Sequence, residues 1–247
     1  MASFKTHYYI RRSHRFLGIF IGLQFIAWTV GGLYFSWSDM DEVHGDYDML
    51  HVHDLPVSRN YISPSLFVDS VNSIRPNAIL VVLKLIELMD QPYWQATFED
   101  TTDVQQELRT YMCHAITGKS RQPLNENEAA IVAMRQYIGK GKIETVEYLT
   151  DASAVHEYRE QPLPAYAVRF DDARNSTIYV ASELGVVTKV RNRPWRQFDF
   201  LWMLHTMGYE ERDNITNWLL RVFSIFGLIT VMSGVALFFV SRKRRVA

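Results

Sequence analysis

The sequence predicts an α+β fold in which a domain of two helix-and-strand repeats is anchored by two transmembrane α-helices. Three observations support this prediction. Two long runs lack charged residues, basic residues cluster beside both runs, and a pattern of helix and strand signals occurs twice between them.

The first apolar run covers residues 16–37, which include no Asp, Glu, Lys or Arg. A helix rises about 1.5 Å per residue, so this run is long enough to cross a bilayer core. A cleaved signal peptide has a shorter apolar region and a small-residue cleavage site, which the following stretch "SWSDMDEVHGD" lacks. We therefore expect an uncleaved transmembrane helix over residues 16–37, preceded by a tail over residues 1–15.

The second apolar run covers residues 222–240 and predicts a transmembrane helix within residues 214–240. Under the positive-inside rule, basic flanks place both tails, residues 1–15 and 241–247, in the cytoplasm. The domain between the helices is then expected on the far side, which in a bacterium is the periplasm, with the chain in the inner membrane. The basic flanks are Lys5, Arg11, Arg12 and Arg15 before the first run, and Arg242, Lys243, Arg244 and Arg245 after the second.

The rest of the chain is acidic. Eight of the 26 basic residues lie in the two flanks, which leaves 18 against 27 acidic residues, a net charge of about −9. An acidic surface repels the phosphates of nucleic acid, so we exclude nucleic acid as a partner.

Cys113 is the only cysteine, so the domain has no internal disulfide and depends on its own apolar core. Its place in the alternating stretch "LRTYMCHAI" predicts a strand with a buried, unreactive thiol.

Two segments of the central domain are similar to each other. "PYWQATFED" at residues 92–100 aligns with "PAYAVRFDD" at residues 164–172, and a second alternating stretch follows each of them. Alternation with a period of two, bounded by turn residues, predicts a β-hairpin in each copy. Gly118 and Gly185 mark the turns that close the second strands.

A helix and a further strand precede each hairpin. "SPSLFVDSVNSI" begins with Ser63 as the expected N-cap and Pro64 at the first helical position. "NENEAAIVAMRQYI" begins with Asn125 and has Glu128 three residues later, as in a capping box. The strand-like runs "AILVVLKLIEL" and "KIETVEYL" follow these helices. Each repeat is thus expected to hold one helix and three strands, over residues 63–124 and 125–193, after a juxtamembrane loop over residues 38–62.

The stretch "YAVRFDDARNSTIYVASELGVV" resembles PepSY domains, and "WQATFED" with "RTYMCHAITGKS" resembles them more loosely. A PepSY region between membrane helices is similar to the PepSY-associated transmembrane family, and "SHRFLGIFIGLQFIAWTVGGLYF" and "FLWMLHTMGY" resemble its membrane segments. The resemblance implies two PepSY-like repeats in the domain. Larger members, including ferric-siderophore reductases, resemble four-helix proteins, whereas this chain has two predicted spans.

His14 is the first candidate cofactor ligand. On a helix it shares a face with Gly18, Phe25, Thr29 and Gly32, with Gly22 just beyond. One interpretation is a helix–helix contact through small residues, including Gly18-x-x-x-Gly22. The other is a haem b site, where the imidazole supplies an axial nitrogen and the glycines leave room for the macrocycle.

His205 is the second candidate ligand. Phe198, Leu201, Trp202, His205 and Tyr209 recur at helical spacing, so residues 194–213 predict an amphipathic helix at the membrane interface. His205 then either faces solvent or ligates a second haem near the outer leaflet.

The family resemblance implies haem, since it matches His14 to the His-Arg of the first family helix and His205 to the Leu-His before a later one. The two histidines are expected at opposite membrane faces, about 25 to 30 Å apart, too far to share one iron. Haem b would therefore need paired histidines in a homodimer with a four-helix core. The resemblance implies electron transfer to a periplasmic ferric-siderophore complex.

The alternative function is a non-catalytic accessory or regulatory subunit, whose PepSY domain binds or restrains a partner protein. Its glycine-bearing helix faces, Gly18 with Gly22 and Gly227 with Gly234, would dock on other membrane subunits.

"HGDYDMLHVHD" contains His44, His51 and His53 among acidic residues, but the spacing matches no strong metal-ligand pattern. A solvated juxtamembrane loop is favoured over a metal site. The sequence has no phosphate-binding loop, H-E-x-x-H or G-x-S-x-G motif, so no catalytic residue is assigned, and any reductase activity would reside in the cofactor.

Overall fold

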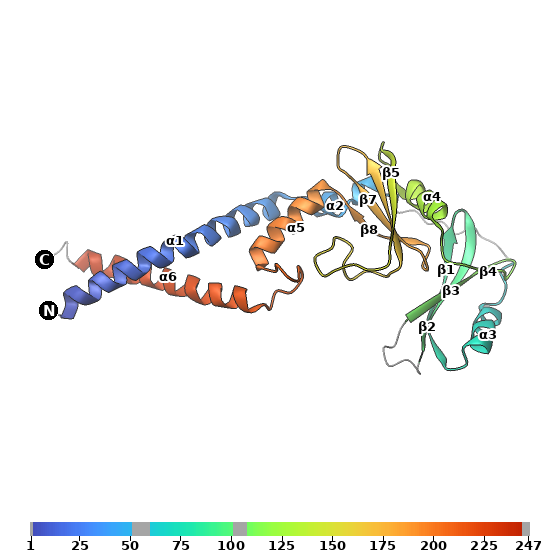
Figure 1. The fold of residues 1–247 in the computed structure, drawn as a ribbon, viewed down its shortest axis with the longest axis horizontal. Helices are drawn as coiled ribbons and strands as arrows, with labels where there is room; N and C mark the ends of the chain where they lie inside the picture. The colour runs from blue at the N-terminus through green and yellow to red at the C-terminus, as the bar shows by residue number, and fades with distance from the viewer. Residues whose placement is uncertain (1, 51–59, 101–107, 244–247) are drawn as a thin grey trace. The chain divides into compact units, whose positions relative to one another are not determined.

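The computed structural model describes residues 2–50, 60–100 and 108–243 (Figure 1). It divides into a helical unit, made of residues 1–40 and 194–247, and an α+β unit, made of residues 41–193. Each unit is described by itself below.

The helical unit contains three helices: α1 (Ala2–Trp37), α5 (Arg193–Thr206) and α6 (Trp218–Lys243). Two stretches, His14–Trp37 and Trp218–Phe239, are long and apolar enough to cross a membrane. Only 11% and 6% of these stretches are buried within the protein, so most of their apolar side chains face outward, as in helices surrounded by lipid. The two predicted apolar helices are therefore confirmed as helices, and their composition indicates membrane association.

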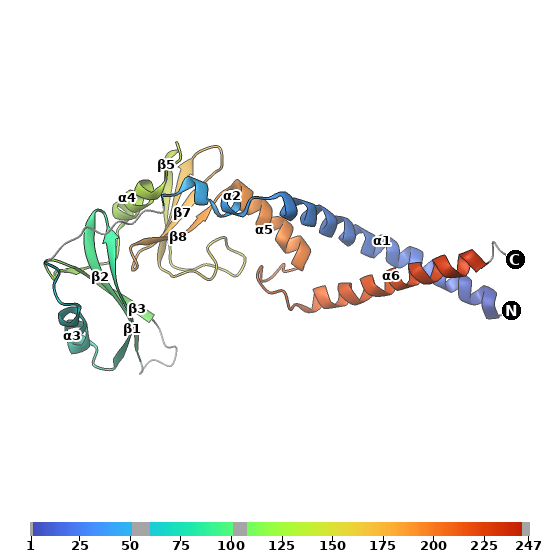
Figure 2. The same ribbon diagram turned by 180° about the vertical axis from the view of Figure 1, so that it is seen from behind.

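Helices α1 and α6 run antiparallel, so the start of α1 and the end of α6 lie at the same end of this unit (Figures 1 and 2). The helix bounds differ from the predicted segments. Helix α1 already begins at Ala2, inside the expected tail, and α5 ends at Thr206 rather than near residue 213. The α5 end has a physical cause, because Met207 takes a left-handed conformation (φ 55°). A Cβ on Gly208 would also lie 2.6 Å from the Glu211 carbonyl oxygen.

In its described residues, the α+β unit contains two four-stranded antiparallel sheets, each with one helix before its first strand. The first group is α3 (Pro64–Ile74), β1 (Ala78–Leu88), β2 (Gln91–Asp100), β3 (Leu108–His114) and β4 (Ser120–Arg121). The second is α4 (Glu126–Gln136), β5 (Lys142–Leu149), β6 (Ala165–Asp171), β7 (Thr177–Ala181) and β8 (Val186–Arg191). Strands follow chain order in both sheets, so β1 and β8 are edge strands.

Each sheet packs against its own helix. Phe67 and Val71 of α3 are buried against Phe98 and Cys113 of the first sheet, and the α4 residues Ala129, Val132 and Ala133 are buried against the second. Helix–sheet packing of this kind buries one face of each element. The prediction of a buried, unpaired Cys113 is confirmed.

The two predicted helix starts have different outcomes. The capping box is confirmed: the Glu128 amide donates to Asn125 Oδ1 (3.0 Å), and the Asn125 amide donates to Glu128 Oε2 (3.1 Å). Pro64 does occupy the first turn of α3, but the Ser63 side chain does not cap the helix. Its hydroxyl instead hydrogen-bonds that of Ser65 (2.7 Å).

Each sheet has four strands where three were expected. Gly118 and Gly185 take left-handed conformations (φ 72° and 66°) at the ends of β3 and β7, as their assignment to turns requires. After these turns the chain forms β4 and β8. The sequence pattern did not separate these strands from the hairpin strands before them.

Contacts also join the two sheets. Leu88 and Met112 of the first sheet belong to the buried cluster beneath the second. Gln95, itself almost fully buried, donates from Nε2 to the carbonyl oxygen of Leu184 (2.6 Å).

The predicted juxtamembrane loop contains α2 (Met40–His44) and a short 3₁₀ helix, η1 (Asp46–Asp48). Arg174, after β6, pairs with Glu42 (3.0 Å) and Asp48 (3.2 Å) and ties both to the second sheet. Gly45 has φ 82°, and a Cβ there would lie 2.8 Å from a Val190 methyl, so the turn between α2 and η1 needs glycine.

Candidate functional site

His14 of α1 is held by a hydrogen bond to α6. Its Nδ1 lies 2.7 Å from Ser233 Oγ. The Ser233 hydroxyl donates its one hydrogen to the Thr230 carbonyl oxygen (2.7 Å), so toward His14 it acts as the acceptor. In the neutral tautomer that donates from Nδ1 to this acceptor, the Nε2 lone pair of His14 would be available for a ligand.

Glycines on both helices lie near His14. A Cβ on Gly234 would lie 3.3 Å from His14 Cε1, so glycine lets the imidazole approach α6 closely. Gly18 and Gly22, one and two turns along α1 from His14, have no atom within 4 Å of where a Cβ would stand. The predicted helix contact is thus made by His14 with Gly234 and by Phe25 with Gly227, and not by the Gly18-x-x-x-Gly22 pair.

His205 of α5 is packed among aromatic rings. Its ring centroid lies 5.9 Å from those of Trp28 and Phe35 on α1, and 6.4 Å from that of Trp202. In addition, Gln24 donates from Nε2 to the Leu204 carbonyl oxygen (2.8 Å), which also holds α5 against α1. His205 is half-buried, so the interpretation in which it simply faces solvent is wrong.

The buried Nδ1 of His205 has no hydrogen-bond partner among the described residues, and neither has the buried Trp28 Nε1. A metal-bound histidine almost always donates its second ring N–H to an acceptor. His14 has such an acceptor in Ser233, whereas His205 has none. His14 thus has the outer-shell partner expected of a haem ligand, and His205 has none among the described residues.

The two histidines lie far apart along α1. His205 contacts Trp28 and Phe35, which are 14 and 21 residues after His14, or roughly 21 and 31 Å at the rise of an α-helix. Within one chain they cannot ligate the same iron.

The remaining histidine cluster is described only in part. His51 and His53 lie outside the described residues. In the described ranges, no group of three His, Cys, Asp or Glu side chains is placed to hold a metal ion. His44 instead borders a cavity in the α+β unit.

The α+β unit has a groove that sequence reasoning missed. A cavity of about 580 Å³ lies between the end of β1, helix α4 and the turn before β8. A second cavity of about 390 Å³ continues along β8, and Leu50 and Gln136 border both. We call the two together the inter-sheet groove. No single segment carries its signal, because it forms where two sheets meet.

Burial and hydrogen bonds shift the pKa values of three groups in the α+β unit. Burial raises the pKa of the Cys113 thiol to about 11, so it stays protonated and unreactive at neutral pH. Burial and the hydrogen bond to Asp172 raise the pKa of Tyr137 to about 12. Burial by itself would raise the pKa of Asp172, but hydrogen bonds from Tyr137, Ser176 and Arg174 outweigh it and lower that pKa.

No protein-family model matches the chain, and no curated protein matches it closely enough to serve as a relative. Among solved structures, the chain is similar to a crystal structure described as that of a candidate lipoprotein from Clostridium difficile 630, at 14% identity. The likeness covers 57% of this chain and 98% of that chain, with a TM-score of 0.24. At so low a TM-score, the likeness carries no argument about fold or function.

Proposed function

We propose that the chain is an inner-membrane electron-transfer subunit of PepSY type that holds haem b at His14, with both termini in the cytoplasm. The observation that carries this proposal is the hydrogen bond between His14 Nδ1 and Ser233 Oγ (2.7 Å). It orients the ring, and with Nδ1 as the donor it would leave Nε2 for a ligand, as the outer-shell partner of a metal-bound histidine does.

The open face of α1 supports the same proposal. Gly18 and Gly22 leave a strip without side chains on the side of the helix that continues from His14. A flat macrocycle would need such a strip beside the histidine that holds it. When bound, haem b would supply one-electron chemistry at its iron, and the protein would set its potential through the histidines that hold it and their hydrogen bonds.

His14 of a second copy would also hold this haem. Each chain contributes two apolar helices, so a two-fold dimer would form a four-helix bundle, which is a common setting for cofactors. The proposal includes only this haem. His205 is left out because its Nδ1 lacks an acceptor, so transfer across the full bilayer would need a further carrier in a partner subunit.

The substrate follows from the family resemblance. This resemblance implies reduction of a ferric-siderophore complex on the side of the membrane that holds the α+β unit. The electrons would come from a quinol or a cytoplasmic donor. The chemistry would reside in the cofactor, and the chain's own residues would bind and orient it.

A spectrum tests this function directly. The full chain, purified in mild detergent from haem-replete cells, should give a Soret band and b-type bands in the reduced-minus-oxidised spectrum. We expect His14→Ala to lose them and His205→Ala to keep them. A wild-type protein that folds but has no Soret absorbance would overturn the proposal.

A second candidate is the non-catalytic accessory subunit, whose α+β unit binds or restrains a partner protein. The inter-sheet groove favours it, because a half-open apolar cavity of about 580 Å³ is large enough for several side chains of a partner. A protein without haem that co-purifies in a stable complex through this groove would support the second candidate over the first.

A further inference from the structure

A separate cavity of about 370 Å³ lies within the α+β unit, where the first repeat ends and α4 begins. Its described lining extends from Tyr93 on β2, through β4 and the residues after it, to Glu128 in the first turn of α4. We call it the junction cavity. Its volume falls within the range of small-molecule sites, roughly 300 to 1,000 Å³.

Arg121 of β4 is held at the wall of the junction cavity by two contacts. Its guanidinium carbon lies 5.4 Å from the centroid of the Tyr93 ring, and its Nη2 lies 2.9 Å from Glu128 Oε1. The side chain is 15% exposed, and Nε and Nη2 are buried. Nη1 is not among these buried nitrogens and has no hydrogen-bond partner in the described structure, so it can reach a ligand. A guanidinium fixed in this way loses little side-chain freedom when an anion binds.

The side chains around the junction cavity leave a surplus of one positive charge. Among its described lining residues, the charged ones are Lys119, Arg121 and Glu128. Both carboxylate oxygens of Glu128 are engaged, Oε1 by Arg121 and Oε2 by the Asn125 amide (3.1 Å). Lys119 is exposed and has no ion pair in the described part of the chain. Glu126, the other acid in the first turn of α4, does not border the cavity, so a bound anion would balance Lys119.

His114 also borders the junction cavity but adds no charge to it. The backbone amides of Ile116 and Thr117 donate to His114 Nδ1 (3.2 and 3.3 Å). A nitrogen that accepts a hydrogen bond carries no proton, so these contacts are those of a neutral ring. The positive charge of the cavity thus comes from Lys119 and Arg121.

Uncharged donors lie beside these two cations. The Ser120 hydroxyl and the Gln122 amide border the junction cavity, and neither side chain has a hydrogen-bond partner among the described residues. An oxyanion accepts several hydrogen bonds at once, and those from charged donors are the strongest. A cation would instead need a free carboxylate, and the one carboxylate of the described lining is already engaged by Arg121 and a backbone amide.

We infer that the junction cavity binds a small oxyanion, a molecule that presents a carboxylate or a phosphate group. Arg121 and Lys119 supply the charge, and Ser120 and Gln122 supply further donors. Glu128 acts as a positioning residue, because it holds the guanidinium against the wall without occupying Nη1. The site lies within the α+β unit and does not depend on haem, so it stands or falls separately from the electron-transfer proposal.

The test uses the full chain in phosphatidylcholine nanodiscs, in a phosphate-free buffer of low ionic strength, and isothermal titration calorimetry. The probes are succinate, inorganic phosphate and 1,4-diaminobutane, and empty nanodiscs give the blank. Succinate and diaminobutane have the same number of carbons and opposite charges, so the pair isolates the sign of the charge. We expect saturable binding of at least one anion and none of diaminobutane. The tighter of the two anions identifies the carboxylate or the phosphate as the preferred group.

Variants then locate the site. Lys119→Gln removes the unbalanced charge and should weaken anion binding by about threefold to tenfold. Arg121→Lys keeps the charge but loses the planar fork, so it should also weaken binding. The matched control is Lys142→Gln on β5, which makes the same charge change at an exposed position outside the cavity. We expect this control to bind like the wild type.

Three results would overturn the inference. One is the absence of saturable binding of both anions at millimolar concentration. Another is binding of diaminobutane as tight as that of the anions. The third is a Lys119→Gln variant that binds no more weakly than Lys142→Gln while its near-UV circular dichroism shows it folded, which would assign any binding to the general charge of the surface.

Discussion

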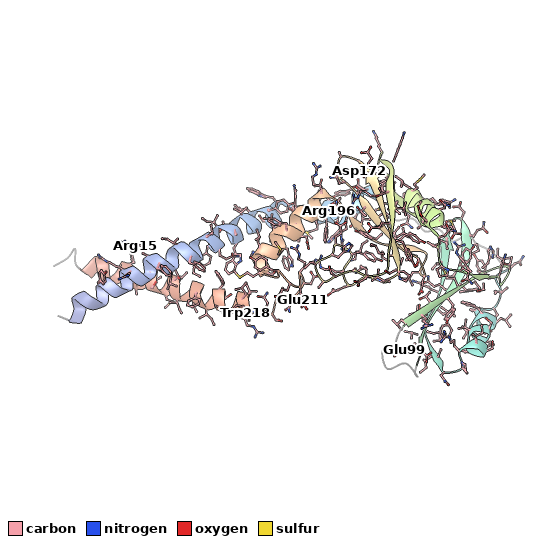
Figure 3. All side chains as sticks on the ribbon, in the orientation of Figure 1. Arg15, Glu99, Asp172, Arg196, Glu211 and Trp218 are labelled. Carbon is pink, nitrogen blue, oxygen red and sulfur yellow. The ribbon has the colours of Figure 1, made fainter. Side chains whose placement is uncertain are left out.

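The hydroxyl of Tyr137 donates a 2.6 Å hydrogen bond to the carboxylate of Asp172, which joins the end of α4 to the turn after β6 (Figure 3 labels Asp172). The other carboxylate oxygen accepts from the backbone amides of Arg174 (3.0 Å) and Ser176 (2.9 Å). One carboxylate thus organises the turn that also positions Arg174 against Glu42 and Asp48.

This arrangement predicts how stability depends on pH. In the folded protein the pKa of Asp172 lies below the ordinary 3.8. The ionised Asp172 therefore stabilises the fold above about pH 4, and this stabilisation is lost as the pH falls further. The pKa of Tyr137 is raised from 10.0 to about 12. The protonated Tyr137 therefore stabilises the fold below pH 10, and this stabilisation is lost as the pH rises from 10 to about 12. Urea unfolding of the full chain in detergent, followed by near-UV circular dichroism, should show both declines.

Tyr137→Phe should lower the free energy of unfolding by about 1.5 kcal/mol at pH 7, because it removes a hydrogen bond to a charged group. Tyr148→Phe is the matched control, since the exposed Tyr148 has a ring contact with Tyr166 but no hydrogen bond from its hydroxyl in the described structure. Equal losses in the two variants would contradict the role given to the Asp172 contact.

The two helix starts make a paired prediction. Asn125→Ala removes one side of a complete capping box and should cost about 1 kcal/mol of unfolding free energy. Ser63→Ala should change it by less than about 0.5 kcal/mol, because the Ser63 side chain caps nothing. The comparison uses urea midpoints of the two variants, and a larger loss for Ser63→Ala would show that the α3 cap is formed after all.

Ser233→Ala should weaken haem binding by about tenfold or more, because it removes the acceptor that orients His14. Haem content is measured by the pyridine haemochrome method, and the reduction potential by spectroelectrochemical titration. Ser224→Ala on the exposed side of α6 is the control and should leave both unchanged. Indistinguishable spectra and potentials in the two variants would argue that the His14–Ser233 bond serves helix packing only.

Thiol labelling tests both the burial of Cys113 and the proposed topology. A maleimide that cannot cross membranes should not label the wild-type chain at pH 7.5, since the single thiol is buried and its pKa is about 11. In Cys113→Ala cells, Glu147→Cys on β5 should react from outside, whereas Ala2→Cys and Ala247→Cys should react only after the cells are opened. Labelling of either end in intact cells would invert the assignment of the membrane faces.

Local signals in the sequence predicted the elements well. Charge-free runs identified α1 and α6, and the spacing of Asn125 and Glu128 identified the start of α4, because each depends on residues close together in the chain. The strands β4 and β8 were missed for a related reason. They continue directly from the turns at Gly118 and Gly185, so the alternating pattern does not separate them from the strands before.

Long-range contacts could not be predicted in the same way. His205 was placed on an interfacial helix, but its burial depends on Trp28 and Phe35, which precede it by more than 160 residues. The inter-sheet groove depends on β1 and β8, whose facing residues are about 100 positions apart. Helical periodicity placed His14 on a glycine-rich face, but only the α6 partner shows which ring nitrogen contacts Ser233.

Helix α1 is an uninterrupted run of 36 residues and so extends about 54 Å, against a hydrocarbon thickness of about 30 Å. Its apolar stretch begins at His14, so the first twelve residues of the helix, Ala2 to Ser13, project about 18 Å beyond that stretch as a stiff rod rather than a loose tail. A tilt of about 20°, which is common for membrane helices, moves the amino end sideways by roughly 18 Å relative to Trp37. A sideways movement of one end of α1 would therefore displace its other end, because the helix has no hinge between them.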